Sequence, residues 1–255
     1  MSNQATIDAL RLARLSGEKL KAYPGPAPRD MAEAFAIQSA VRASIGWAHK
    51  GWKIGCTSQR AQIALHTDGP FPGPVYAEWL FASGAHVPTL PSNSRTTEPE
   101  IAFTMASGLG KRNEPWTVAE VLAAVASVHA SIEIVNPRLP KGFADVVEWY
   151  VADGGLSHAL VLGAGVKPLA EGHYAKITNR VSVNGKAKST GLGANALGGP
   201  DLALTWLAND LIKKGLSLRA GDVVTTGVIT DVFNTDIGDY VEAVYDHLGT
   251  VSVQL

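Results

Sequence analysis

Three glutamates at two places in the chain are the side chains best suited to chemistry. Glu98 and Glu100 lie in the segment TTEPEIAF, and Glu133 lies in ASIEIVNPRL. Residues two apart on an extended strand point to the same face, so Glu98 and Glu100 share a face. Carboxylates on one face repel each other unless one is protonated or a cation lies between them. With a third carboxylate from another strand they would form a site of hard oxygen ligands, which suits magnesium, manganese or calcium.

The same pattern also allows a simpler interpretation. In that interpretation the three glutamates are solvated strand residues, some of them paired with Lys or Arg, and the spacing alone leaves both interpretations open. Pro99 separates the first two glutamates and lacks the N–H that a strand interior uses for pairing. We therefore expect this stretch at the edge of a sheet or at the entry to a strand.

Lys53 and two residues that follow it are the other candidates for a site. Lys53 lies in GWKIGCTS, an apolar, glycine-bracketed run that predicts a buried strand entering a turn. A lysine there either reaches solvent or is held charged by carboxylates, where it would bind a substrate carboxylate or shuttle a proton. Ser58 follows at the turn, where hydroxyls often cap backbone groups. Asp68 begins the Gly/Pro-rich loop HTDGPFPGPVY, which either lines a site or simply turns the chain.

Several other kinds of site are not favoured. The seven histidines include no closely spaced metal-binding pair, and Cys56 is the only cysteine, so the sequence supports neither a zinc site nor a disulfide. The G-x-S-x-G motif of serine hydrolases is missing. Arg138 follows the Glu133 strand, and we expect it to form a structural ion pair with Asp145 or Glu148.

The composition is that of an ordinary folded protein. The chain has 255 residues, of which 46% are apolar and 18% charged, and its formal net charge is −1. A nearly neutral chain carries no electrostatic footprint for nucleic acid or an acidic membrane surface. No stretch approaches the ~20 apolar residues that span a bilayer, and the first twenty residues do not resemble a secretory signal. We expect a soluble, cytoplasmic protein.

The elements that would position these residues change in character along the chain. Helical spacing of apolar residues predicts helices over 5–20 and 29–45, and from Trp52 onward short β-branched runs alternate with Gly, Pro, Asn and Asp. Two further helices are expected over 118–130 and 201–214, and Asn184-Gly185 predicts a two-residue hairpin. The pattern indicates an α+β chain with a helical N-terminal region and first core strand over 1–75 and a mixed β core over 76–255.

Taken together, the motifs resemble the 2-keto-4-pentenoate hydratase group of the fumarylacetoacetate hydrolase superfamily, which includes 4-oxalocrotonate decarboxylases. The resemblance runs in the same order over nearly the whole chain, through GWKIGCTS, LHTDGPFPGPVYAEW, EPEIAF, SIEIVNPRL, LVLGAGV, LGANALGGPDLALTWLANDL, LRAGDVVTTG and LGTVSVQL. It implies a mixed β-roll core of the fumarylacetoacetate hydrolase type with a small helical N-terminal part. It also implies a divalent metal, Mg²⁺ or Mn²⁺, held by Glu98, Glu100 and Glu133.

The resemblance further implies a substrate class and roles for single residues. The group acts on 2-oxo acids or their 2-hydroxydienoate enols from the catabolism of aromatic ring-cleavage products. A metal ion would stabilise the enolate while water adds at the far end of the substrate. Lys53 matches the active-site lysine of the group, Asp68 is a weaker candidate for a proton relay, and Ser58 and Asp153 are candidate substrate contacts. A homo-oligomer is expected.

This chain also departs from the group's usual pattern. Many hydratases have A-D-N-A-S where this chain has ADGGL at 152–156, so Asp153 is kept but an amide becomes Gly154 and a hydroxyl becomes Leu156. The segment 228–233 is also bulkier than the short loop usual for the group. If these positions contact substrate, the pocket for its far end is more apolar and roomier.

Three functions remain open on the sequence. The first is a metal-dependent hydratase of 2-hydroxy-2,4-dienoates. The second keeps the metal and the enolate but decarboxylates a 2-oxo acid of the 4-oxalocrotonate type or hydrolyses an acylpyruvate; hydrolysis is disfavoured because no His–Glu pair is evident. The third is a non-catalytic partner subunit, which the retention of the three glutamates and Lys53 disfavours.

Overall fold

A large mixed sheet carries the candidate residues. The computed structural model describes residues 3–88, 90 and 94–255 of the chain. The sheet has the strand order β2-β1-β10-β5-β6-β7-β3, and β11 pairs with β5. Its strands are β1 (His49–Gly55), β2 (Phe71–Tyr76), β3 (Leu80–Ala82), β5 (Thr96–Met105), β6 (Val125–Val135), β7 (Ser157–Leu162), β10 (Val223–Thr225) and β11 (Phe233–Asn234).

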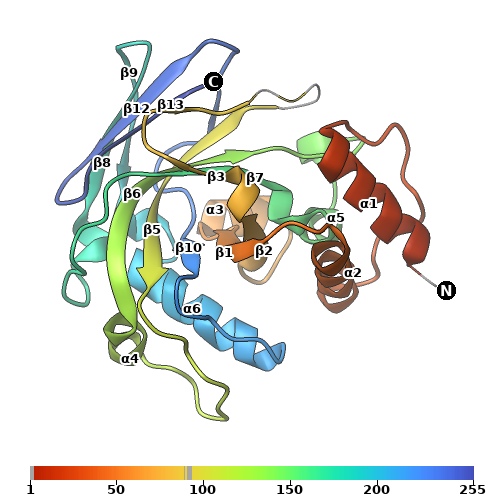
Figure 1. Ribbon diagram of the computed structural model, residues 1–255, viewed down its shortest axis with the longest axis horizontal. Coiled ribbons are helices and arrows are strands. Elements are labelled where there is room, and N and C mark those ends of the chain that lie inside the picture. Colours follow the sequence, from red (N-terminus) through yellow and green to blue (C-terminus); the bar gives the residue numbers. More distant parts are fainter. Residues whose placement is uncertain (1–2, 89, 91–93) are drawn as a thin grey trace.

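A smaller sheet and one long helix cover one face of this large sheet. The smaller sheet has the order β4-β13-β12-β8-β9, and it lies at the end of the molecule opposite the N-terminal helices (Figure 1). Its strands are β4 (Ala85–His86), β8 (Thr178–Val183), β9 (Lys186–Leu192), β12 (Tyr240–Tyr245) and β13 (Gly249–Gln254). Together with α6 (Pro200–Lys213), the two sheets enclose the main core, which includes Phe103 of β5, Val251 of β13 and Leu207 of α6.

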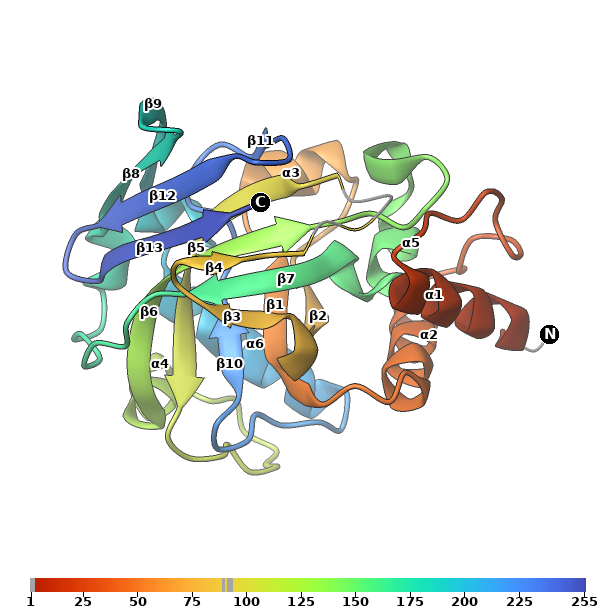
Figure 2. The same cartoon turned by 45° about the horizontal axis from the view of Figure 1, so that its top comes forward.

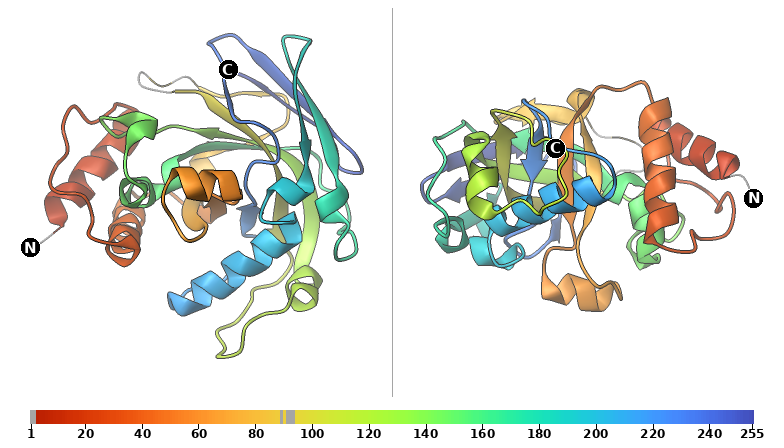
Figure 3. Two further views of the ribbon diagram at one scale, coloured as in Figure 1. Left: turned by 180° about the vertical axis from the view of Figure 1, so that it is seen from behind. Right: turned by 90° about the horizontal axis from the view of Figure 1, so that it is seen from below.

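The N-terminal helices form a second, smaller core at the other end of the large sheet. The helices α1 (Gln4–Ser16), α2 (Met31–Ser44) and α5 (Val147–Ala152) pack together there (Figures 2 and 3). Leu10, Ile37 and Trp149 are buried between them. The side chain of Asp30 caps α2 by accepting a hydrogen bond from the Glu33 amide at 2.8 Å, which satisfies one of the free donors of the first turn.

The predicted α+β class with N-terminal helices is confirmed, and so are most long elements. The expected helices over 5–20, 29–45 and 201–214 correspond to α1, α2 and α6. At the predicted hairpin, Asn184 (φ 52°) and Gly185 (φ 75°) join β8 to β9 in the left-handed backbone that a two-residue turn needs. None of the helices among the described residues is long and apolar enough to cross a membrane.

The prediction of a helix over 118–130 is wrong in its second half. The helix α4 spans only Val118–Ala123, and β6 begins at Val125 and pairs with β5 along nearly its whole length. The pairing with β5 therefore outweighs the local helical spacing. This pairing cannot be predicted from the segment 125–130 alone. Two short helices were not predicted, α3 (Gln59–Ala64) and α5, because neither is long enough to show a helical period.

Candidate metal centre

The three glutamates meet on one face of the large sheet. Glu98 of β5 lies directly opposite Glu133 of β6, and Glu100 lies opposite Ser131 one step further along the same strand pair. One carboxylate oxygen from each glutamate lies within 4.8 Å of the others. Glu100 and Glu133 are buried and Glu98 is half-buried. Glu100 and Glu133 are therefore not solvated, although Glu133 does pair with a lysine, Lys53, as the simpler interpretation allowed.

The strand that carries the pair is not at a sheet edge, so the expectation based on Pro99 is also wrong. β5 lies between β6 on one side and both β10 and β11 on the other. β10 pairs with 102–104 and β11 with 96–97, which leaves Pro99 between them. The Pro99 carbonyl accepts from the Ile229 amide at 3.1 Å on this side. Because a strand residue's nitrogen and carbonyl face the same side, the missing N–H of Pro99 falls in the gap between β10 and β11.

One oxygen of Glu100 is held and the other is not. Its Oε2 accepts from the Gly227 amide at 2.7 Å and from the Thr225 hydroxyl. Gly227 has φ +99°, and a Cβ there would lie only 2.0 Å from Thr57 Oγ1, so glycine is required for this amide to approach. The Oε1 atom is buried and has no hydrogen-bond partner among the described residues. An unpartnered buried carboxylate oxygen beside two further carboxylates fits a hard divalent cation such as Mg²⁺ or Mn²⁺.

The electrostatics of the three carboxylates agree with this assignment. Burial raises the pKa of all three glutamates. The neighbouring charges of Glu133 and Glu98 push the pKa of Glu100 further up, well above its ordinary value. The pKa of Glu133 rises to about 7, although the Lys53 ammonium opposes the rise. The raised pKa values mean that, without a cation, burial and mutual repulsion favour proton binding at this site, and a divalent ion would compete with those protons.

Lys53 is buried against the glutamates. Its side chain is 3% exposed, and its Nζ lies 3.3 Å from Glu133 Oε2. Burial alone would lower the pKa of Lys53, but the charges of Glu133, Glu98 and Glu100 outweigh that effect and raise it. Of the two interpretations of this lysine, the structure therefore supports the one in which carboxylates hold it charged.

A tight turn lies against the aliphatic part of Lys53. Gly154, Gly155 and Leu156 have φ values of 70°, 65° and 61°, three consecutive residues in the left-handed region. A Cβ on Gly155 would lie 3.3 Å from Lys53 Cδ, so there is little space for a side chain at this position. Leu156 is 6% exposed and packs in the core of the helical unit. The glycines that replace the usual A-D-N-A-S residues therefore form one wall around Lys53.

Ser58 and Asp68 lie on the chain that leaves Lys53. Ser58 is half-buried and accepts a hydrogen bond from the Ala61 amide at 3.2 Å, so it caps α3. Its hydroxyl hydrogen is free to be donated elsewhere. Asp68 is exposed in the loop between α3 and β2. No contact described for Asp68 brings it to the glutamates, and its role as a proton relay stays a prediction.

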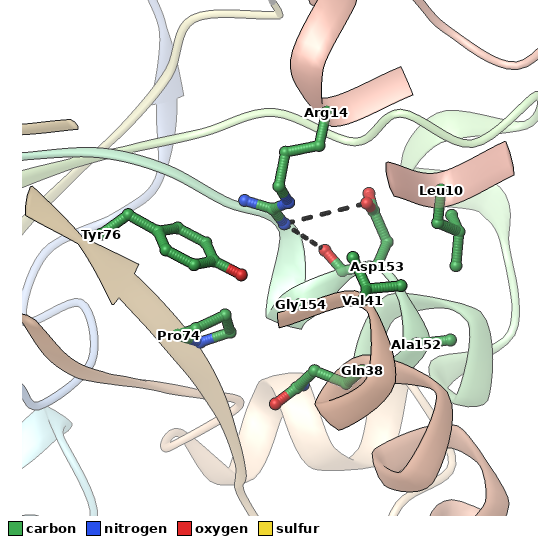
Figure 4. Close-up of a pocket in the computed structure, with 9 residues that line it drawn as sticks. All are labelled: Leu10, Arg14, Gln38, Val41, Pro74, Tyr76, Ala152, Asp153 and Gly154. Atoms are coloured by element: carbon green, nitrogen blue, oxygen red, sulfur yellow. Dashed lines mark hydrogen bonds and ion pairs between the residues drawn. The ribbon is translucent and has the colours of Figure 1, made fainter. Parts of the chain in front are cut away.

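Asp153 is held by two buried arginines, Arg138 and Arg14, of which Figure 4 shows Arg14. Its Oδ1 accepts from Arg138 Nε at 2.8 Å, and its Oδ2 accepts from the Arg138 amide at 3.0 Å. Arg14 of α1 donates to the Asp153 carbonyl at 2.7 Å and lies 3.9 Å from Oδ1. Burial and the charge of Arg138 lower the pKa of Arg14 to about 10. The expected pairing of Arg138 with Asp145 or Glu148 is wrong. The chain turns after α5 and places Asp153 beside Arg138, which pairs with it instead.

Replacing Asp153 with Asn should destabilise the fold. The substitution removes the negative charge that compensates two buried guanidinium groups, and breaking a buried ion pair in this way costs about 3 kcal/mol. Urea unfolding of Asp153→Asn should show this loss, whereas Asp236→Asn, at an exposed loop position, should match the parent. A normal free energy of unfolding combined with a raised KM would instead favour the substrate-binding role predicted for Asp153.

His158 gives the protein a sensitivity to acid. It is buried on β7 with its ring 4.2 Å from that of Trp79, and burial, then the charges of Arg138 and Arg14, lower its pKa to about 3. Because the unfolded chain binds this proton near pH 6.5, the stability that the neutral ring contributes is complete above pH 6.5 and is lost as the pH falls toward 3. The loss at pH 5 is about 2 kcal/mol.

The difference between the parent and His158→Phe isolates this contribution from that of the other titrating groups. In urea unfolding at pH 7.5 and pH 5, the variant should lose about 2 kcal/mol less than the parent. His86→Phe, at an exposed position, should keep the parent's pH dependence. Equal losses in His158→Phe and the parent would rule out His158 as the source.

Sequence reasoning missed the residues that hold the site together. Thr225 and Gly227 bind Glu100, and Arg14 binds the turn beside Lys53. Arg14 lies in a helix with an ordinary amphipathic pattern, and its partners are more than 130 residues away in the sequence. Thr225 and Gly227 lie in the segment LRAGDVVTTG, where nothing local indicates that a hydroxyl and an amide point at a carboxylate.

Comparisons with known proteins place this arrangement in context. The profile of the fumarylacetoacetate (FAA) hydrolase C-terminal family matches residues 75–255. The 2-keto-4-pentenoate hydratase of Burkholderia vietnamiensis (strain G4 / LMG 22486) is 32% identical over 95% of this chain and 93% of its own length. The 2-hydroxyhexa-2,4-dienoate hydratase of Comamonas testosteroni is 28% identical over 98% of this chain and 95% of its own.

Solved structures agree on the fold. The 4-oxalocrotonate decarboxylase from Pseudomonas putida G7, complexed with magnesium and adipate, superposes with a TM-score of 0.86 at 22% sequence identity, over 100% of this chain and 98% of that one. The same enzyme complexed with calcium and acetate gives a TM-score of 0.83 at 21% identity, with the same coverage. These likenesses confirm that the fold is of the fumarylacetoacetate hydrolase type.

Proposed function

The chain belongs to the fumarylacetoacetate hydrolase family, and on that premise we propose that it is a divalent-metal-dependent hydratase of 2-hydroxy-2,4-dienoates. The observation that carries the proposal is the meeting of Glu98, Glu100 and Glu133 beside the buried Lys53. Relatives named as hydratases match almost the whole chain at 28–32% identity, which favours hydration over the other reactions of this fold. The product would be a 4-hydroxy-2-oxo acid, formed in the catabolism of aromatic compounds.

The three glutamates would hold the metal, which we propose to be Mg²⁺ or Mn²⁺. All three supply carboxylate oxygens, and the unpartnered Oε1 of Glu100 lies among them. A decarboxylase of the same fold is complexed with magnesium in one structure and calcium in another. When bound, the ion would supply electrophilic stabilisation of the negative charge that develops on the C2 oxygen of the substrate.

The other residues would bind the substrate and move protons. Lys53, which the glutamates hold charged, is placed to neutralise the C1 carboxylate of the substrate and to donate a proton during the reaction, while the proton of the C2 hydroxyl leaves to solvent. Ser58 has a hydroxyl hydrogen that it can donate to substrate. Asp68, in the loop between α3 and β2, would relay protons between the site and solvent. Both carboxylate oxygens of Asp153 already accept hydrogen bonds from Arg138. Asp153 would therefore serve to position the turn 154–156 beside Lys53 and would not contact substrate itself.

The proposed reaction has two stages. In the first, the dienol loses its hydroxyl proton and gains a proton at C5, which gives a 2-oxo-3-enoate. In the second, the oxygen of water adds to C4, one of its protons is released, and C3 gains a proton. Both stages place negative charge on the same C2 oxygen, so one set of carboxylates and one lysine serve both.

Decarboxylation is the second candidate function. Loss of CO₂ from the far end of 4-oxalocrotonate would use the same stabilisation of charge at C2, but the decarboxylase of this fold is only 22% identical, so its likeness supports the fold alone. Hydrolysis of an acylpyruvate is less favoured, since two central histidines are engaged elsewhere: His129 contacts Thr104 and His158 packs on Trp79. A cytoplasmic homo-oligomer remains our expectation for the assembled enzyme.

A spectrophotometric assay tests the proposal directly. The protein is mixed with 2-hydroxypenta-2,4-dienoate and, separately, with 4-oxalocrotonate, each with and without added Mg²⁺. Metal-dependent loss of the dienoate absorbance with formation of 4-hydroxy-2-oxopentanoate is the expected result. Metal-dependent release of CO₂ from 4-oxalocrotonate alone would favour the decarboxylase instead. If neither acid reacts in the presence of metal, the non-catalytic subunit becomes the better description.

A further inference from the structure

A solvent-open cavity of about 240 Å³ lies at the end of β5 nearest the glutamates. Five residues line it, from three separate parts of the chain: Thr96, Phe143, Val232, Phe233 and Asn234. The substrate atoms that would bind at the metal centre are only those of C1 and C2, so the proposed function leaves this cavity without an assigned use.

The register of the strands places the cavity next to the metal centre. Thr96 precedes Glu98 by two residues on β5, so the two side chains point to the same face of the sheet. Two residues along a strand span roughly 7 Å. Asn234 of β11 lies directly opposite Thr96, on the side of β5 away from β6. The cavity therefore begins one side-chain step beyond the glutamates, on the face that they occupy.

The lining is mainly apolar, with one polar side chain that retains donors. Thr96 Oγ1 donates to Asn234 Oδ1 at 2.8 Å, which leaves the amide N–H groups of the exposed Asn234 as the polar donors of the lining. Phe143 and Val232 supply apolar surface to it and are 49% and 48% exposed. None of the described lining residues carries a charge. Cavities of about 150 Å³ with an apolar lining take up benzene, so this one is large enough for an alkyl chain or a small ring.

We infer that this cavity binds the far end of the substrate, and that the preferred substrates are 2-hydroxy-2,4-dienoates that carry an alkyl or aryl group at that end. The inference rests on the proposed function, because it takes the metal centre as the site that holds C1 and C2. Each methylene moved from water into an apolar site gains about 0.8 kcal/mol, which corresponds to roughly fourfold in affinity.

A substrate with a second carboxylate fits this lining poorly. Its charge would lose water without gaining a cationic partner among the lining residues. The charged groups described nearby lie outside the lining. Lys188 stacks over the Phe233 ring with its Nζ 5.3 Å from the ring centroid, and Asp231 lies 4.0 Å from Arg60 in a fully exposed pair. Arg95 precedes Thr96, and its Nε donates to the Thr235 carbonyl at 3.2 Å. Arg95 and Lys188 are the groups that would favour a carboxylate tail.

Binding of unreactive 2-oxo acids tests the inference without turnover. Isothermal titration of the Mn²⁺-loaded protein compares 2-oxopentanoate, 2-oxooctanoate and 2-oxooctanedioate, which share one metal-binding end and differ in their tails. We expect 2-oxooctanoate to bind at least tenfold more tightly than either of the other two. Equal affinities for the short and long monoacids would overturn the inference. So would tighter binding of the diacid, above all if that preference disappears in Lys188→Ala.

Variants in the exposed part of the lining provide the second measurement. Val232→Arg should lower the affinity for 2-oxooctanoate at least tenfold and raise that for the diacid, and Phe143→Ala should weaken 2-oxooctanoate binding alone. Ile237→Arg is the matched control, because Ile237 is an exposed apolar residue outside the lining, and it should change neither affinity. An unchanged preference in Val232→Arg and Phe143→Ala would overturn the inference.

The outcomes separate this inference from the proposed function. Tail-dependent binding in a protein that turns over no dienoate would support the cavity assignment and refute the hydratase. Turnover of 2-hydroxypenta-2,4-dienoate without any dependence on tail length, in binding or in kcat/KM, would support the hydratase and refute the cavity assignment.

Discussion

Glu133→Gln is expected to weaken Mn²⁺ binding by at least about a hundredfold and to abolish measurable hydration. Loss of a partner that only orients a metal ligand typically costs 10- to 100-fold in affinity, and Glu133 is proposed to be a ligand itself. Glutamine keeps the shape of the side chain but replaces a charged oxygen donor with a neutral amide. Titration of Mn²⁺, followed by its electron paramagnetic resonance signal, measures the loss.

The same variant should keep its fold. Glutamine is neutral, and the pKa of Glu133 near 7 means that the parent already carries a proton there in part of its population at neutral pH. The far-ultraviolet circular dichroism spectrum should therefore match that of the parent. Glu171→Gln, at an exposed position, serves as the control and should bind Mn²⁺ normally. A folded Glu133→Gln protein with unchanged Mn²⁺ affinity would contradict the metal assignment.

Lys53→Met is the second substitution with a large expected effect. Methionine fills a similar apolar volume but removes the ammonium group that lies 3.3 Å from Glu133. General acid–base catalysis contributes about 10²- to 10⁴-fold to rates, so we expect kcat/KM to fall by roughly a thousandfold. Because Lys53 is also proposed to neutralise the substrate carboxylate, KM should rise while kcat falls.

The neighbouring strand residue Lys50 provides a close control. It lies on the same strand, β1, three residues earlier and exposed to solvent. Lys50→Met should leave kcat/KM within about twofold of the parent, as is usual for surface substitutions. A Lys53→Met enzyme that retains the parent's kcat at saturating substrate would show that proton transfer does not depend on this lysine. It would leave Lys53 only the role of binding the carboxylate.

Much of the candidate site followed from local patterns and from the family resemblance. An E-x-E segment on a predicted strand is enough to place Glu98 and Glu100 on one face; the residues alone also make Glu133 and Lys53 candidates, and the resemblance assigns their roles. What local patterns do not contain is strand register. Only the pairing of 98 with 133 turns separate acidic residues into one cluster, and that pairing depends on segments 35 residues apart.

The failures have the same physical origin. Pro99 is a residue typical of edge strands, yet β5 is a central strand. The N–H that Pro99 lacks is not needed, because the pairing on that side of β5 is interrupted between β10 and β11. The segment 125–130 has acceptable helical spacing but pairs with β5 along nearly its whole length. Arg138 has acidic residues close by in sequence, and its partner is instead the carboxylate that the turn after α5 returns to it. In each case a contact between distant segments outweighs a local preference.

The two ends of the proposed site are attached to the fold in different ways. The glutamates and Lys53 are fixed by paired strands in the middle of the large sheet, while Phe143 and Val232 come from exposed connecting segments beyond the strand ends. Substitutions in such segments cost little stability. Substitutions in the buried strands usually destabilise the fold and are therefore seldom tolerated. Gene duplication followed by drift at these few surface positions would therefore yield enzymes for new ring-cleavage products while the shared enolate chemistry is inherited unchanged.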